Sequence, residues 1–410
     1  MWTIALIPLL FLLFTWIFYK MQRDGFTIKE SGLILGYRII LGCLYGFIFA
    51  RYFNGDDTWY FHRGSLEEHQ KLLNDPIQFF TDLNPIPAFE RNEGWWQGWY
   101  YYLSDLEFWL LTKPMALFNF ISRGNYYVNV VFFNFLTCWG SVWLYRLFLP
   151  VFPNKRKEVF FFVFFFPFPL FWMTGIRAEG WLLFFLALAL WRFSGWMKEK
   201  KIRHLFSFVL ALAGMIILRS VLVFILLPIL AAWWLQERRS WPAWRSMILV
   251  FGISGALFWA SKWLDAEHNA PQMIVQKQAA FFALHGQTRF QLDTLEATPT
   301  SYLTLLPQAV ANTFLRPYLW EAKGFLQWIS AGSTLFLWAL ILLFVTQKAW
   351  RRIGKWPPFL LYTALFGFLL YLFIGYTVPF PGAIIRYKSL GEYFLLLPLL
   401  LNINWRAKQI

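Results

Sequence analysis

Residues 31–61 read SGLILGYRIILGCLYGFIFARYFNGDDTWYF, and this stretch decides the class of fold. Residues 31–50 form an apolar run long enough for an α-helix to cross the roughly 30 Å hydrocarbon core of a bilayer. Arg51 follows the run, and the adjacent carboxylates of Asp56 and Asp57 come a few residues later. The stretch therefore predicts a membrane span that ends beside two charged side chains.

The composition of the whole chain agrees with a membrane protein. Of its 410 residues, 59% are hydrophobic, 22% are aromatic and only 14% are charged, and the mean hydropathy is +0.47. These values exclude an ordinary soluble domain and predict a multi-pass integral membrane protein. The formal net charge of +15 is expected at cytoplasmic loops and anionic headgroups, so nucleic acid is not an expected partner. Cys43 and Cys138 lie in apolar runs and predict small buried side chains without a disulfide framework.

Long apolar runs recur along the chain and predict an all-α membrane fold with about eleven transmembrane helices. The run at 2–19 has no basic segment before it and no small-residue cleavage site after it, so we expect a retained span and not a signal peptide. The predicted spans are residues 2–19, 31–50, 127–149, 159–174, 180–197, 205–218, 220–235, 246–263, 328–347, 358–378 and 389–404.

Short basic segments alternate with long polar segments between these runs. Because lysine and arginine mark cytoplasmic loops, the basic segments predict an outside N-terminus and an inside C-terminus. The outer side would receive two long loops, residues 51–126 and 264–327. The first loop would carry the acidic motif, a polar helix near residues 66–73 and interfacial helices, among them residues 108–120. No change of composition separates two domains, so residues 1–410 are expected to form a single polytopic domain.

Asp56 and Asp57 are open to a structural and a catalytic interpretation. Asn54-Gly55-Asp56 is ordinary turn chemistry, and an aspartate after a span can simply cap the next helix. The aromatic residues that follow, up to Phe61, would instead press the carboxylates against an apolar surface and favour a general base.

Further charged residues are predicted on the outer side. Glu179 lies between two very apolar runs, two residues after Arg177, and could orient a polar substrate or hold a cation; it could also merely reach to the interface. Several outward cations together suggest a bound phosphate, although each one alone is more typical of a headgroup contact. These cations are Arg177, Arg219, Arg316, Arg386 and Lys388. The five histidines show no metal-ligand spacing, and no phosphate-binding glycine loop or nucleophile elbow is present.

The acidic motif resembles that of the GT-C superfamily of polytopic glycosyltransferases, which includes protein O-mannosyltransferases and lipid A aminoarabinose transferases. In that superfamily an acidic pair in the first external loop, followed by a tyrosine three residues later, supplies the base that activates the acceptor. Asp56, Asp57 and Tyr60 match this pattern. The resemblance implies that Asp56 is the base and Asp57 its neighbour.

The resemblance covers other parts of the chain and departs from the superfamily at one point. It extends to Phe166-Pro167 before Arg177-Ala178-Glu179, and to Arg386-Tyr387-Lys388 before the last span. Superfamily members commonly place the acidic loop after their first span, whereas an extra span precedes it here. The implied substrate-binding residues are Tyr60, Arg177, Glu179, Arg219, Arg316, Arg386 and Lys388.

The superfamily uses a polyprenyl-phosphate sugar as donor, and physical reasoning agrees, because a lipid carrier can reach a site on the outer face. The departing lipid phosphate is a stable anion and needs a cationic clamp more than a general acid. The implied activity is transfer of a hexosyl or pentosyl group, with inversion, to an acceptor glycan, glycolipid or protein. The expected location is a bacterial inner membrane with the site facing the periplasm. No cofactor is required by the sequence, and a divalent cation is left open.

Two alternatives stand beside this interpretation. A polymerase or ligase of lipid-linked oligosaccharides would also use outward basic residues but would not need the acidic pair. A transporter or flippase would predict inverted repeats and ionisable residues near the middle of the membrane, and neither is evident in the sequence.

Overall fold

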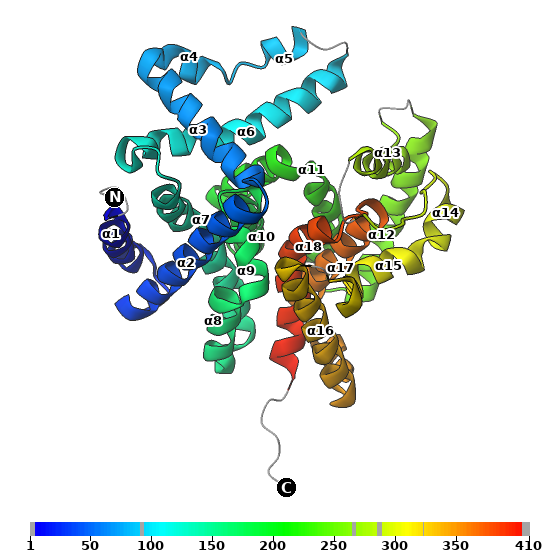
Figure 1. The fold of residues 1–410 in the computed structure, drawn as a ribbon. Coiled ribbons are helices and arrows are strands. Elements are labelled where there is room, and N and C mark those ends of the chain that lie inside the picture. Colours follow the sequence, from blue (N-terminus) through cyan, green and yellow to red (C-terminus); the bar gives the residue numbers. More distant parts are fainter. Residues whose placement is uncertain (1–4, 91–93, 265–267, 285–288, 323, 404–410) are drawn as a thin grey trace. The chain divides into compact units, whose positions relative to one another are not determined.

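The computed structural model describes residues 5–90, 94–264, 268–284, 289–322 and 324–403. Within those residues the chain consists of α-helices and short 3₁₀ helices and contains no strand (Figure 1). It divides into two compact units, Met1–Ser220 and Val221–Ile410, which we call unit 1 and unit 2.

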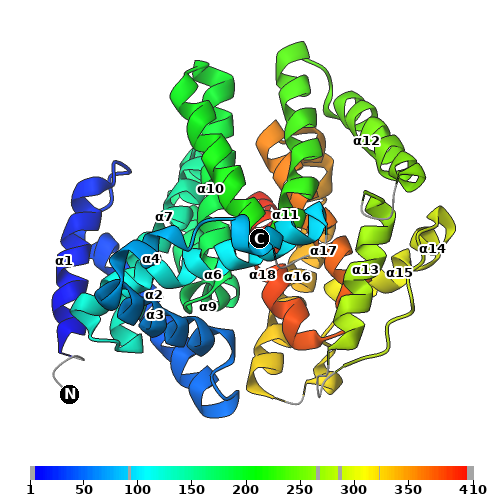
Figure 2. The same cartoon turned by 90° about the horizontal axis from the view of Figure 1, so that it is seen from above.

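Unit 1 contains the acidic motif. Its elements are α1 (Leu6–Met21), α2 (Ile28–Tyr52), α3 (Asp56–Asn74), α4 (Pro76–Thr81), α5 (Ile86–Glu90), α6 (Trp95–Ser122), α7 (Tyr126–Phe148), η1 (Leu149–Val151), η2 (Pro153–Lys155), α8 (Arg156–Phe165), α9 (Pro167–Thr174), α10 (Ala178–Glu199) and the first part of α11 (Ile202–Arg239). Helices α7 and α10 lie side by side in Figures 1 and 2, and α2 packs on α7 and α9.

Unit 2 contains the remaining elements. They are the second part of α11, α12 (Ala243–Ala260), η3 (Ser261–Trp263), α13 (Ala270–Ala283), α14 (Pro299–Thr304), α15 (Leu306–Phe314), η4 (Leu319–Glu321), α16 (Phe325–Thr346), η5 (Ala349–Lys355), α17 (Pro358–Thr377) and α18 (Pro381–Asn402). Helix α18 packs on α16 and α17, and α15 also packs on α17.

Seven helices in the described residues are long and apolar enough to cross a membrane, so the chain is an all-α, multi-pass membrane protein. They are α2, α7, α10, α11, α12, α16 and α17. The predicted spans 205–218 and 220–235 both lie in α11, which is broken at Arg219 by non-helical backbone (φ −158°, ψ 89°). The predicted span 159–174 corresponds to a pair of helices bent by 41°, which raises the number to eight if the pair is one span.

The two ends of the predicted series differ from ordinary spans. Helix α1 has only 16 residues, so at 1.5 Å per residue it is about 24 Å long and shorter than the hydrocarbon core. Helix α18 carries Arg386, Lys388 and Glu392, which is more charge than a typical span contains. Together with the two predicted spans that share α11 and the bent pair of helices, α1 and α18 are the reason that eleven spans are not confirmed.

The first long loop contains longer helices than the sequence suggests. The polar helix predicted near residues 66–73 is part of the 19-residue α3. Residues 108–120 are not a separate helix but belong to α6, a 28-residue helix that continues through Pro114 and also includes the aromatic residues from Trp99 to Tyr102. Helix α3 packs along α6, so the acidic motif at the start of α3 is attached to a two-helix layer.

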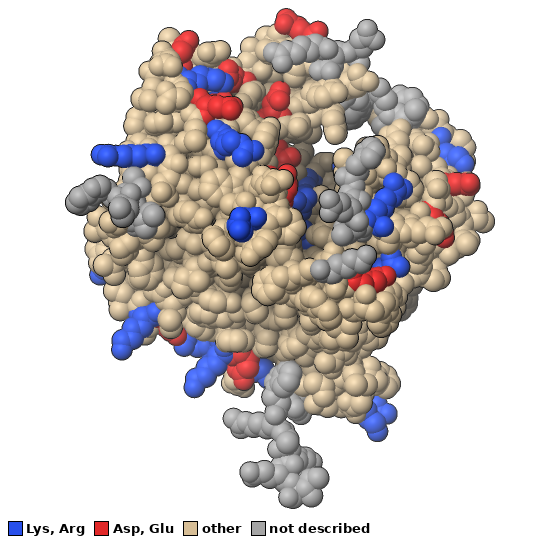
Figure 3. All heavy atoms as spheres, in the orientation of Figure 1, with Lys and Arg blue, Asp and Glu red and all other residues tan. Residues whose placement is uncertain are grey.

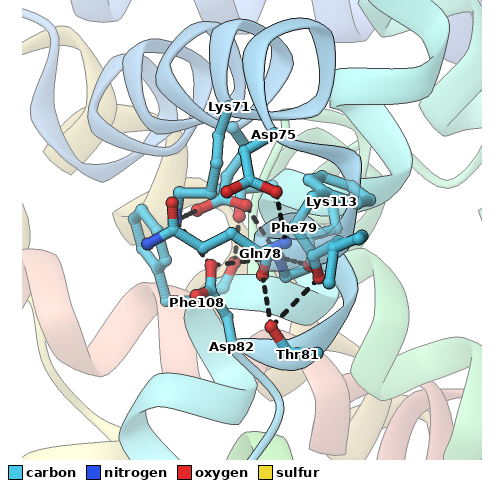
Figure 4. A network of polar contacts seen from close by, with 11 residues as sticks. Lys71, Asp75, Gln78, Phe79, Thr81, Asp82, Phe108 and Lys113 are labelled. Atoms are coloured by element: carbon cyan, nitrogen blue, oxygen red, sulfur yellow. Dashed lines mark hydrogen bonds and ion pairs between the residues drawn. The ribbon is translucent and has the colours of Figure 1, made fainter.

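A network of ion pairs around the buried Glu68 holds this layer together (Figure 4). Lys113 of α6 binds Glu68 of α3, with Nζ 2.8 Å from Oε2, and its Nζ also donates to the backbone oxygen of Phe79 in α4. Lys71 binds Glu68 and Asp82, at 3.0 and 2.5 Å. Two lysines and two carboxylates therefore balance one another across α3, α4 and α6.

Few charged side chains lie on the surface around the middle of unit 1, although Arg38 of α2 is buried inside and donates to Ser141 and Thr137 of α7. On the face drawn in Figure 3, the red and blue atoms of this unit gather toward its two ends, and a broad, mainly tan band separates them. Such a band is expected where hydrocarbon covers the protein, because charges within a bilayer are costly.

Candidate functional site

The acidic motif begins α3 directly after the span α2. Asn54, Gly55 and Asp56 have φ of 51°, 95° and 46°, and this run of left-handed backbone turns the chain out of α2 and into α3. Glycine, asparagine and aspartate are the residues that adopt such backbone most readily. The sequence Asn-Gly-Asp therefore folds as the predicted turn, and Asp56 and Asp57 occupy the first turn of α3, where the helix dipole favours negative charge.

Arg177 joins both carboxylates of the motif. Its Nη1 donates to Asp56 Oδ2 at 2.8 Å and to the hydroxyl of Tyr45 at 2.7 Å, and its Nη2 binds Asp57 Oδ2. Only 2% of the Arg177 side chain is exposed, whereas 33% of Asp56 and 49% of Asp57 are exposed. The buried guanidinium of Arg177 thus binds two partly exposed carboxylates.

Local packing explains how Arg177 reaches this position. It lies between α9 and α10 in extended backbone, just after Gly175. A Cβ on Gly175 would stand 2.4 Å from the ring of Tyr45, so only glycine lets this segment lie against α2. Asn134 of α7 donates to the carbonyl oxygen of Thr174 at 2.9 Å, which fixes the start of the same segment.

Glu179 and Arg219 extend the network. Glu179 Oε2 lies 3.5 Å from Arg177 Nε, and its Oε1 lies 3.3 Å from Arg219 Nη2. Glu179 is buried, with 5% of its side chain exposed, while 27% of Arg219 is exposed. The break of α11 falls at Arg219 itself, the residue that binds Glu179. Three carboxylates and two guanidinium groups of unit 1 are therefore linked in one chain of contacts.

The electrostatics of the network keep Arg177 charged. Burial lowers the pKa of Arg177, but the Tyr45 hydroxyl, Glu179, Asp57 and Asp56 raise it more strongly, so the pKa lies well above its usual value. Arg177 therefore stays positively charged in its contact with Asp56 and Asp57.

The two aspartates use their oxygens differently. In the described part of the chain, Asp56 accepts the Arg177 hydrogen bond through Oδ2, and its Oδ1 accepts none. Asp57 has contacts beyond its bond to Arg177. Asp56 thus combines a fixed orientation with an oxygen that can still accept a proton, which is what a general base requires.

The aromatic residues after the motif pack on other aromatic rings and on the backbone of α2. Trp59 stacks on Tyr126 at 4.2 Å between ring centroids and donates to the backbone oxygen of Gly46. Tyr60 is exposed, and its ring contacts Phe61 and Phe108. The contact that the structure shows for both carboxylates is the one with Arg177.

The other predicted cations belong to unit 2. Lys388 is buried, and its Nζ donates to Thr334 Oγ1 at 3.0 Å and lies 3.5 Å from the backbone oxygen of Arg316. The guanidinium of Arg316 stacks over Phe290, with 4.1 Å from Cζ to the ring centroid. Lys388 and Arg316 are thus brought together within unit 2.

Arg386 stands two residues before Lys388 on α18. Its Nη2 donates to the hydroxyl of Tyr387 at 2.7 Å. One turn beyond Lys388, the buried Glu392 accepts a hydrogen bond from Ser333 Oγ at 2.9 Å. Arg316, Arg386 and Lys388 form a second group of candidate residues, which belongs to unit 2.

Sequence reasoning missed Tyr45, Thr334 and Glu392. Tyr45 is one of 18 tyrosines and sits inside an apolar run, where nothing in the sequence marks its hydroxyl as a partner of Arg177. Glu392 carried a signal, because a carboxylate four residues after a lysine in an otherwise apolar helix is costly without a partner.

No family model, curated protein or solved structure matches this chain. Among the residues that the structure describes, no three His, Cys, Asp or Glu side chains converge as a metal site would require. The candidate site therefore rests on its own geometry.

Proposed function

We propose that this protein is a membrane-embedded glycosyltransferase of the GT-C kind, which moves a sugar from a polyprenyl-phosphate carrier to an acceptor at the extracytoplasmic face. The observation that carries the proposal is Asp56: one oxygen is held by the buried Arg177, the other accepts no hydrogen bond in the described residues, and the side chain is one-third exposed beside a span. Such a carboxylate can be approached by an acceptor from water and by a donor from the bilayer.

The reaction follows from these roles. The acceptor hydroxyl or amine donates its proton to Oδ1 of Asp56 while its lone pair attacks the anomeric carbon. The bond between that carbon and the phosphate oxygen breaks, and its electron pair leaves with the lipid phosphate. Attack opposite the leaving group inverts the anomeric centre, and no second carboxylate is needed as an acid, because the phosphate is a stable anion.

The remaining residues of the network have positioning or charge-stabilising roles in this proposal. Arg177 orients both carboxylates. Asp57, as the second carboxylate on Arg177, helps to balance the positive charge of the guanidinium. Arg219 is held by Glu179 and is partly exposed, so its guanidinium is available in unit 1 to the leaving phosphate. The assignment of Tyr60, Arg316, Arg386 and Lys388 to the substrate stays a prediction, as do the eleven spans, the single domain and a bacterial inner membrane with a periplasmic site.

Asp56→Asn tests the base. We expect the variant to reach the membrane in normal amounts and to lose about 10²–10⁴-fold of its transfer rate, the usual contribution of a general base. The assay measures transfer of label from a panel of polyprenyl-phosphate sugars in membranes that contain or lack the protein. The matched control is Glu67→Gln, which makes the same change of charge at an exposed residue of the same helix.

Wild-type activity in Asp56→Asn would reject Asp56 as the base. Mass spectrometry of envelope lipids and glycoproteins from cells with and without the protein identifies the sugar and the acceptor. Unchanged glycans, together with transport of a labelled lipid across the membrane, would favour a flippase instead.

A further inference from the structure

The opposite end of unit 1 holds a guanidinium that the proposed reaction does not use. Arg192 lies in the last two turns of α10, and its Nη1 donates to Nδ1 of the buried His204 in α11, at 3.3 Å. Its Nε is buried and has no hydrogen-bond partner. Within the described residues, no carboxylate forms an ion pair with Arg192.

Neighbouring cations are already neutralised by carboxylates. Arg146 of α7 binds Asp24, with Nε 2.8 Å from Oδ1, and Arg203 binds Glu199, with Nη2 3.6 Å from Oε2. Arg192 is the exception among these three arginines, so an anion from outside the chain would complete the charge balance here.

The aromatic residues give this place the character of a membrane interface. The guanidinium carbons of Arg192 and Arg146 lie 4.3 and 5.0 Å from the centroid of the Trp191 ring, so they are at most 9.3 Å apart, the sum of the two distances. Trp143 stacks on the same indole at 6.1 Å. Indole rings favour the headgroup layer, and arginine binds phosphate through paired hydrogen bonds.

We propose that Arg192, with Arg146 and His204 around it, binds the phosphate of an anionic phospholipid at the basic end of unit 1. The ends of α7 and α10 and the start of α11 form the site. Basic pockets between membrane helices at the cytoplasmic side are typical sites for such headgroups. This site is independent of the proposed transferase reaction.

The experiment counts bound lipid. The protein is reconstituted in nanodiscs of phosphatidylcholine with a minor fraction of phosphatidylglycerol, released into the gas phase, and the retained phosphatidylglycerol is measured by native mass spectrometry. Arg192→Gln should weaken retention about tenfold, the size expected for hydrogen bonds to a charged group. The matched control, Arg203→Gln, removes a cation that is 67% exposed and paired with Glu199, and should retain lipid as the wild type does.

Two further arms keep the test decisive. Arg192→Lys retains the charge but not the guanidinium fork and should show an intermediate loss, which separates binding from misfolding of the glutamine variant. Equal retention by the wild type and both Arg192 variants would overturn the proposal. Displacement of the lipid by inorganic phosphate at low concentration would also overturn it, because free phosphate would then be the ligand.

Discussion

At the scale of single residues, Arg177 organises the acidic motif through contacts with Tyr45, Asp56, Asp57 and Glu179. A buried guanidinium is tolerated only where its donors are satisfied, since an unpaired buried charge is strongly destabilising. The partners of Arg177 come from α2, α3 and α10, so one side chain links two spans and the helix that carries the acidic motif.

Tyr45→Phe should weaken this link without changing the packing of the ring on Gly175. We expect a loss of about 1.5–3 kcal/mol in the free energy of unfolding, because a hydrogen bond to a charged group is removed. We also expect transfer activity to fall less than in Asp56→Asn. Denaturant titration in detergent and the transfer assay measure the two effects. Tyr100→Phe, at an exposed residue of α6, should leave both quantities unchanged.

His62 gives unit 1 a pH dependence. Burial lowers the pKa of this α3 imidazole from 6.5 to about 4, with a smaller lowering from Arg63 and an opposing effect of the Gly124 backbone. Between these values the unfolded chain binds a proton that the folded chain does not, so stability should fall as the pH drops from about 6.5 to about 4 and level off below.

The loss is at most about 3.4 kcal/mol, from a pKa difference of about 2.5 units at 1.36 kcal/mol per unit. Unfolding measured at pH 7 and pH 4.5 for the wild type and His62→Gln checks it. The variant should lose most of this pH dependence, and an equal slope in both proteins would contradict the assignment to His62.

At the scale of helices, hydropathy and length predicted most of the spans. The prediction differs from the structure at α18, which carries three charged residues, and at α11, whose backbone breaks at Arg219. Runs such as residues 328–347 and 358–378 are apolar on all sides and coincide with α16 and α17. The prediction placed a short interfacial helix at residues 108–120, apart from the aromatic residues before it, whereas α6 is one helix from Trp95 to Ser122 with Pro114 inside it. The pairing of Arg177 with Asp56 joins residues 121 positions apart, and no local pattern in one sequence encodes such a contact.

The ion network of Figure 4 should hold α3, α4 and α6 together. Lys113→Met leaves the buried Glu68 with Lys71 as its only cation of the network, and we expect about 1–3 kcal/mol of destabilisation from the lost charge-assisted hydrogen bonds. Hydrogen exchange in α3 and α4 should become faster. Lys157→Met, at an exposed lysine of α8, should leave exchange in these helices unchanged.

At the scale of the whole molecule, the arrangement of charge predicts which side of the membrane each loop faces. In a background without Cys43 and Cys138, Tyr60→Cys should react with a membrane-impermeant thiol reagent in intact cells. Arg203→Cys should react only after the membrane is opened. Both residues are exposed, so labelling depends on which side of the membrane the reagent can reach and not on burial of the cysteine. Labelling of both cysteines in intact cells would contradict the topology on which the transferase proposal depends.

The left-handed run from Asn54 to Asp56 determines how a mutational scan of the motif should be interpreted. Alanine at position 56 would add backbone strain of about 1–2 kcal/mol to the loss of the carboxylate. An inactive Asp56→Ala variant would therefore not distinguish a change of backbone conformation from the loss of the base. Asparagine tolerates the same φ and isolates the proton acceptor. At Gly55 even alanine would place its Cβ 2.8 Å from that of Trp59, so intolerance there reports geometry alone.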